Sequence, residues 1–241
     1  MNERGILMQP ESVVGILADR KTQTRRVVRM TDAARRETSG PSAFVEWQGL
    51  SGSGTQYHAR VCNPDVNGLG GYWATCPYGV PGDRLWVRET FNWSATDELL
   101  PKEPRQLCLE RAGYRAKYVV WRADGEREHP KWGKARWLSP LFMPKWASRL
   151  TLVVKALRLE RVQSITEEDA VAEGITRTDG RWWDGAPHKI KGTPRAFPTA
   201  HEAYADLWDA INGKRAPWKS NPWVWRVCFE KLKGKRSWLT T

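Results

Sequence analysis

The sequence has few cysteines and no long hydrophobic run. Its four cysteines are widely spaced and form no C-x-x-C pair, and the chain is too long to need disulfide staples. No stretch approaches the ~18 consecutive apolar residues that a membrane span requires. The first residues contain no apolar core followed by a small-residue cleavage site. We therefore expect a reduced, cytoplasmic protein that is not secreted and has no membrane partner.

The common phosphate-binding, metalloprotease and hydrolase motifs are also missing. The sequence contains no G-x-x-x-x-G-K-[ST], G-x-G-x-x-G, H-E-x-x-H or G-x-S-x-G. A zinc site can be drawn on paper from His58 and Cys62, with Cys76, Cys108 and His129 further along the chain, but these spacings are irregular. We therefore expect no metal and no cofactor.

Positive charge and tryptophan are both present in excess. The chain has 39 Lys and Arg against 27 Asp and Glu, a formal charge of +12, and 15 Trp against 6 Tyr and 5 Phe. The charge favours an anionic partner, most simply RNA or DNA, because Lys and Arg neutralise phosphates and release counterions. The alternative is a basic protein whose charge serves solubility alone.

The charge is concentrated in residues 101–149, which hold twelve Lys and Arg against five acids. The same segment carries Trp121, Trp132, Trp137 and Trp146. Cations interleaved with aromatic rings are typical of a nucleic-acid surface, where the rings stack on bases. The alternative is an insertion whose tryptophans pack onto the main core, and the sequence leaves both open.

The apolar periodicity predicts a single domain over residues 1–241 with few regular elements. The predicted helices span 9–19, 166–174 and 197–212, and the predicted strands span 85–90, 150–162 and 221–232. A bulge is expected at Ala156. Long insertions are expected at about 31–75, 101–145 and 176–199. The first is rich in Gly, Ser and Asn and is expected to be loop-rich, and the third is polar. Because few strands alternate with crossover helices, we expect an α+β fold built on a small mixed or antiparallel β-barrel.

The basic segment R-K-T-Q-T-R-R after the first predicted helix is a candidate reactive site. In a helical turn Lys21 and Thr24 would share a face, whereas in a strand they would face opposite sides. Arg20, Arg25 and Arg26 disfavour a further positive charge and would lower the pKa of Lys21. A neutral lysine beside a threonine hydroxyl makes a nucleophile. The alternative is a solvated basic turn that only touches phosphate.

Four segments resemble the ASCH domains of the PUA-like superfamily. The first is D-R-K-T-Q-T-R-R, which resembles the signature G-R-K-T-x-T-x-R with Asp19 where Gly is common. The others are P-G-D-R-L-W-V-R-E at 81–89, S-I-T-E-E-D-A-V-A-E-G-I at 164–175 and N-P-W-V-W-R-V-C-F-E at 221–230. In combination they are most similar to ASCH proteins of bacteriophages and prophages. The resemblance implies a PUA-like barrel decorated by insertions.

Within this superfamily the resemblance extends to the bacterial N4-acetylcytidine amidohydrolases. It implies Lys21, Thr24 and Glu173 as the catalytic set. Lys21 would take the proton of Thr24, whose oxygen attacks the acyl carbon, and Glu173 would orient the lysine or protonate the leaving nitrogen. Backbone N–H groups or Arg26 would stabilise the oxyanion. The alternative for Glu173 is an ordinary acidic residue in the last turn of a helix.

The expected substrate is therefore a modified cytidine nucleoside or nucleotide, or the same base in RNA or DNA. Candidate substrate- or anion-binding residues are Arg20, Arg25, Arg26, Trp86 and Glu89. The alternative function is a nucleic-acid-binding PUA-like module that is non-catalytic or ribonucleolytic. An intact Lys, Thr and Glu set favours the enzyme, because phosphate binding does not require it.

Overall fold

The computed structural model describes residues 2–39, 42–65, 71–93, 119–125, 128–129, 133–134, 137–178, 180–183 and 196–232. In this part of the chain the helices are α1 (Pro10–Leu17), α2 (Asp32–Glu37), α4 (Glu167–Ala172) and α5 (Ala200–Asn212). The strands are β1 (Glu3–Leu7), β2 (Gln23–Val27), β3 (Phe44–Leu50), β4 (Tyr57–Cys62), β5 (Tyr72–Thr75), β6 (Arg84–Arg88), β7 (Phe91–Trp93), β8 (Val119–Trp121), β9 (Glu128–His129), β10 (Gly133–Lys134), β11 (Thr151–Arg161), β12 (Thr176–Thr178), β13 (Arg181–Trp183), β14 (Ala196–Phe197) and β15 (Trp223–Lys231).

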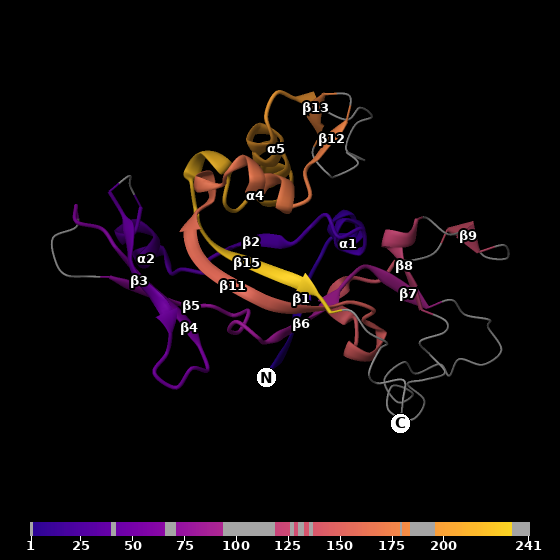
Figure 1. Cartoon of the computed structure of the whole chain (residues 1–241), viewed down its shortest axis with the longest axis horizontal. Coiled ribbons are helices and arrows are strands. Elements are labelled where there is room, and N and C mark those ends of the chain that lie inside the picture. The colour runs from indigo at the N-terminus through magenta and orange to yellow at the C-terminus, as the bar shows by residue number, and fades with distance from the viewer. Residues whose placement is uncertain are drawn as a thin grey trace.

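A five-stranded sheet in the order β1-β6-β11-β15-β2 forms the centre of this α+β fold (Figure 1). The pairing of β1 with β6 is parallel and the others are antiparallel. Its edge strands β1 and β2 do not pair with each other, so the described strands form no closed barrel, contrary to expectation. At the open side the Arg26 guanidinium donates to the Leu7 carbonyl and contacts Met8 Sδ. The Arg26 side chain thus joins the β2 edge to the chain end of β1, where hydrogen bonds between the two strands would close a barrel.

The two long strands β11 and β15 separate two hydrophobic clusters. Along β15, Trp225, Val227 and Phe229 point into the main core, while Val224 points into a second cluster formed with α4 and α5. Both helices lie over that face of the sheet (Figure 1). The register of β11 shifts between Val154 and Ala156, which confirms the predicted bulge. A strand buried on both faces explains why residues 223–229 are almost continuously apolar.

Residues 31–75 were expected to be loop-rich, and this expectation is wrong. They contain α2 and an antiparallel sheet in the order β3-β4-β5. Ala59, Val61 and Ala74 on the inner face of this sheet are buried in the main core. The glycines and serines that suggested loops sit in the connections, such as residues 51–56. The segment is therefore part of the hydrophobic core.

The basic segment lies largely outside the described residues, Trp132 included. Trp121 and Trp146 are half-buried against a small cluster of Phe91, Met143 and Ala147. The Trp121 ring nitrogen donates to the Ala147 carbonyl at 3.2 Å. Trp121 and Trp146 therefore pack onto the protein, as the second interpretation of this basic segment predicted. In the third expected insertion, β12, β13 and β14 form a small antiparallel sheet, and residues 184–195 lie outside the described residues.

Two further findings concern the helices and the cysteines. No described helix has the length and the apolar character that crossing a membrane requires. Cys62, Cys76 and Cys228 carry free thiols. Burial raises the pKa of Cys76 to about 12, so this thiol is neutral and packs as an apolar group in the main core.

Candidate active site: a buried lysine–glutamate pair

Lys21 and Glu173 meet in the interior although they are far apart in the sequence. Lys21 Nζ lies 2.7 Å from Glu173 Oε2 and 2.5 Å from the Glu173 carbonyl oxygen. Each residue is only 6% exposed. The expected proximity of the two groups is therefore found in the structure.

Glu173 is placed by the end of helix α4. The helix begins after Thr166, whose hydroxyl accepts the N–H of Asp169 three residues later, which is the spacing of a capping box. It ends before Gly174, whose φ of +107° favours glycine, and the Gly174 N–H returns to the carbonyl of Val171. The chain turns sharply there. Glu173 consequently sits in the last turn, with its carbonyl and its side chain both available.

The segment that joins α1 to β2 covers this helix end. The Thr22 N–H donates to the Ala172 carbonyl at 2.9 Å, next to the bond from Lys21 Nζ to the Glu173 carbonyl. A cation at a helix C-terminus also interacts favourably with the helix dipole. Lys21 therefore caps α4 as well as pairing with its last acidic side chain.

The stem of Lys21 is packed between two glycines. A Cβ built on Gly15 would lie 3.2 Å from Lys21 Cβ, and one built on Gly174 would lie 3.7 Å from it. Burial lowers the pKa of Lys21, and this effect outweighs the opposing attraction of Glu173. The charges of Arg26 and Arg25 act in the same direction as burial. The lysine therefore loses its proton more readily than a solvated lysine.

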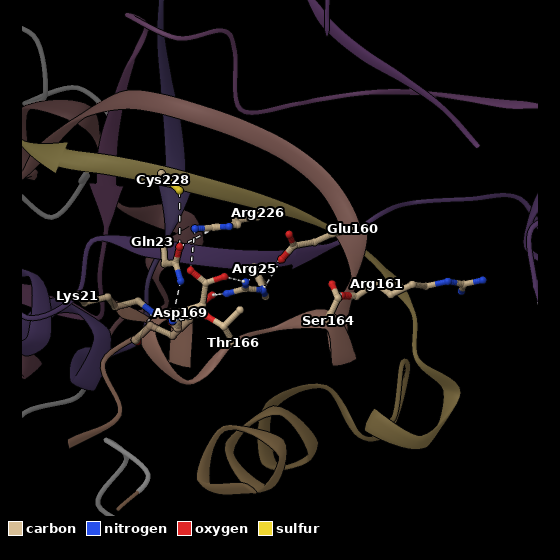
Figure 2. A network of polar contacts seen from close by, with 11 residues as sticks. Lys21, Gln23, Arg25, Glu160, Arg161, Ser164, Thr166, Asp169, Arg226 and Cys228 are labelled. Atoms are coloured by element: carbon tan, nitrogen blue, oxygen red, sulfur yellow. Dashed lines mark hydrogen bonds and ion pairs between the residues drawn. The ribbon is translucent and has the colours of Figure 1, made fainter. Parts of the chain in front are cut away.

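Arg25 belongs to the same buried network (Figure 2). Its Nη2 lies 2.7 Å from both Glu160 Oε1 and Asp169 Oδ2, and its Nη1 lies 3.4 Å from Glu173 Oε1. Burial opposes the charge of Arg25, but Glu173 and Glu160 outweigh it and raise the pKa of the guanidinium. Arg25 was expected to bind an anion, and the structure pairs it with carboxylates of the protein itself.

The network also contains four residues that were not predicted as site residues: Gln23, Asp169, Arg226 and Cys228. Asp169 Oδ1 accepts from Arg226 Nη2 at 2.7 Å, and the Asp169 carbonyl accepts from Gln23 Nε2 at 2.7 Å. Arg226 Nε donates to Gln23 Oε1 at 2.9 Å, and the Cys228 thiol contacts the same oxygen (Figure 2). The sequence signal that could have identified Arg226 is its position between buried residues on strand β15. These contacts fix β2 and β15 against α4.

Thr24 lies on strand β2, so the expectation of a helical turn at this position is wrong. It pairs with Val227 on β15 and is 5% exposed. Alternation along the strand places it on the opposite face from Gln23 and Arg25. Among the described residues its hydroxyl makes no hydrogen bond, and Lys21 Nζ bonds Glu173 instead. The structure therefore buries Thr24 on the face of β2 opposite Arg25 and does not join its hydroxyl to the Lys21–Glu173 pair.

The remaining expected binding residues are dispersed. Arg20 is exposed, and Arg26 spans the open side of the sheet. Trp86 is half-buried beneath the Arg88 guanidinium, whose carbon lies 4.6 Å from the ring centroid. Glu89 is fully buried, and its oxygens accept from Arg149 Nε and Nη2 at 2.9 Å each. Burial raises the pKa of Glu89 against the influence of this partner.

Within the described residues, no group of three or more His, Cys, Asp or Glu side chains is placed to hold a metal ion. Cys108, one of the possible zinc ligands named from the sequence, lies outside the described residues. Comparison of the chain with family models, with curated proteins and with solved structures gave no match in any of the three.

Proposed function

We propose that this protein is an ASCH-type amidohydrolase that removes an N4-acyl group from cytosine in a nucleoside or nucleotide. Lys21, Thr24 and Glu173 form its catalytic set. The observation that carries the proposal is the buried contact between Lys21 and Glu173, together with the lowered pKa of the lysine. The R-K-T-x-T resemblance is what suggests the substrate class.

The second partner of Glu173 supports a role for Lys21 as a base. Arg25 Nη1 lies 3.4 Å from Glu173 Oε1, so the carboxylate keeps a cation nearby when Lys21 is neutral. In an isolated buried pair, loss of the lysine proton would leave the carboxylate as an unpaired buried charge, which is strongly destabilising. The network therefore allows a proton to leave Lys21 and return during a reaction.

The proposed reaction has two stages. Neutral Lys21 takes the proton of Thr24, and Thr24 Oγ1 attacks the acyl carbon. The bond from carbon to the exocyclic nitrogen then breaks, and this nitrogen takes the proton from Lys21 as cytosine leaves. Water hydrolyses the acyl-threonine and releases the carboxylic acid. The lysine side chain must rotate from Glu173 toward Thr24 when substrate is present.

Arg26 is the proposed oxyanion donor. It lies two residues after Thr24 on β2, and alternation places both on the same face of the strand. Its Nε is buried and has no hydrogen-bond partner among the described residues. A preorganised donor beside the reacting carbonyl stabilises the developing negative charge.

A second candidate, nucleic-acid binding without acyl chemistry, is favoured by the net charge of +12. One assay separates the two. The purified protein is incubated with N4-acetylcytidine, and loss of the acyl-cytosine absorbance is followed beside Lys21→Met, Thr24→Val and the matched control Thr22→Val. We expect turnover by the native protein and by Thr22→Val only. Absence of turnover across a panel of N4-acylated cytosines overturns the proposal.

A further inference from the structure

The outer face of the small sheet β3-β4-β5 carries exposed aromatic side chains. Trp47 is 43% exposed, Trp73 is 55% exposed and Phe44 is 50% exposed. Together with Arg60 these residues define the aromatic sheet face. The sheet lies at one end of the molecule, away from α4 and α5 (Figure 1). The tryptophan excess is therefore partly displayed on the surface.

Three of these residues form one row across the sheet. Trp47 on β3 pairs with Arg60 on β4, and Arg60 pairs with Trp73 on β5. The two indole rings have centroids 5.7 Å apart, inclined at 59°. The Arg60 guanidinium carbon lies 5.9 Å from the centroid of the Trp73 ring. Two aromatic rings and a cation are thus presented side by side on rigid strands.

This face is not needed to bury the core. The opposite face of the same strands supplies Ala59, Val61 and Ala74 to the main core. Tyr57 and Tyr72 also pack inward against that core, whereas the rings of Trp47 and Trp73 remain exposed on the outer face, where large apolar side chains are less favourable. Trp47 and Trp73 are therefore available to a partner.

We propose that the aromatic sheet face binds single-stranded nucleic acid, with unpaired bases stacked on Trp47 and Trp73 and a phosphate contacted by Arg60. Exposed rings on a sheet are a stacking platform for every base, because each base has an aromatic face. The net charge of +12 complements a polyanion. A nucleoside-sized substrate needs no such platform.

The charges next to the platform are compatible with phosphate binding. Arg60 pairs with Glu46 at 2.6 Å, but Glu46 is exposed and a pair of this kind is weak, so a phosphate competes for the guanidinium. Arg60 is therefore the cation that lies beside the exposed rings and is accessible to a phosphate.

This binding does not depend on the proposed chemistry, because none of its residues belongs to the Lys21 network. The test uses the full-length protein and a fluorescein-labelled uridine oligonucleotide of about 12 nucleotides, within the range that one small domain covers. Anisotropy is measured for the native protein, Trp47→Ala, Trp73→Ala and Trp73→Phe. The matched control is Phe142→Ala, which removes an aromatic ring that is 75% exposed elsewhere.

We expect each alanine variant to weaken binding by about tenfold, and Trp73→Phe to retain most of it because a stacking ring remains. Phe142→Ala should bind as the native protein does. Binding should fall steeply with salt, and Arg60→Gln should reduce the salt slope by about one. Thermal unfolding of each variant shows whether the fold is intact.

Three outcomes would overturn the proposal. The first is absence of oligonucleotide binding by the folded native protein, and the second is binding that the double variant Trp47→Ala/Trp73→Ala leaves unchanged. The third is self-association that the double variant abolishes while oligonucleotide binding is absent, which would assign the face to a second copy of this chain. Hydrolysis of N4-acetylcytidine mononucleoside should proceed at the native rate in the double variant, so the two proposals fail separately.

Discussion

Lys21 Nζ contacts Glu173 Oε2 at 2.7 Å across a sequence separation of 152 residues. The two groups are brought together by the fold, because no short stretch of sequence contains both. The lysine follows α1, the glutamate ends α4, and both are enclosed by the network around Arg25 and Asp169. Because both charges are nearly excluded from water, their contact affects folding as well as any chemistry.

The two members of this pair should be coupled in the free energy of unfolding. Glu173→Gln leaves the buried Lys21 ammonium without its carboxylate, and a loss of about 3 kcal/mol in the free energy of unfolding is expected. Lys21→Met should also destabilise. In the double variant the loss should be smaller than the sum of the single losses. Urea denaturation of the four proteins measures the coupling.

The exposed pair of Lys155 and Glu230 is the matched control. Its atoms are also 2.7 Å apart, but both side chains are more than half exposed. Lys155→Met and Glu230→Gln should each change the free energy of unfolding by less than about 1 kcal/mol. Equal losses at the buried and the exposed pair would contradict the account.

Stability should rise with pH in the range where Lys21 titrates. Its native pKa is lowered from 10.5 by burial, so between these two values the unfolded state binds more protons than the native state. The free energy of unfolding contributed by this group therefore increases from the lowered native pKa up to 10.5. The measurement is the pH profile of stability for native protein and Lys21→Met. A profile that is the same in both would show that Lys21 does not titrate in this way.

A methyl group on Gly15 should disturb the lysine without unfolding the helix. The added Cβ would lie 3.2 Å from Lys21 Cβ, closer than ordinary contact, whereas alanine is the better helix former by about 1 kcal/mol. We expect Gly15→Ala to leave the melting temperature nearly unchanged and to slow N4-acetylcytidine hydrolysis by about tenfold or more. Val14→Ala, on the exposed side of α1, is the control. Native activity in Gly15→Ala would show that the lysine position is not critical.

The sequence predicts those elements whose apolar pattern and caps lie within the element itself. α5, the capped start of α4, the bulge in β11 and the final strand all follow from local periodicity and capping, and the structure has them. Asp19, where the signature that this segment resembles commonly has glycine, has a φ of +56°, a backbone conformation that glycine adopts without strain.

The elements that the sequence does not predict depend on distant partners. Strand β2 has a basic sequence, and Arg25 is buried only because Glu160, Asp169 and Glu173 meet it from β11 and α4. A local pattern cannot contain that information. The sheet β3-β4-β5 was missed because large apolar side chains lie on both of its faces: Tyr57 and Tyr72 pack against the main core, whereas Trp47 and Trp73 are exposed. Periodicity read from large apolar residues therefore fails there.

In the proposed reaction Thr24 attacks the acyl group with Lys21 as its base. The most direct measurement is rapid acid quenching of the protein during reaction with N4-acetylcytidine that carries an isotopic label in its acetyl group, followed by peptide mass spectrometry. We expect a labelled acetyl group on the peptide that contains Thr24, and none in Thr24→Val or Lys21→Met. Hydrolysis that proceeds without label on Thr24, or no hydrolysis at all, would contradict the proposed reaction.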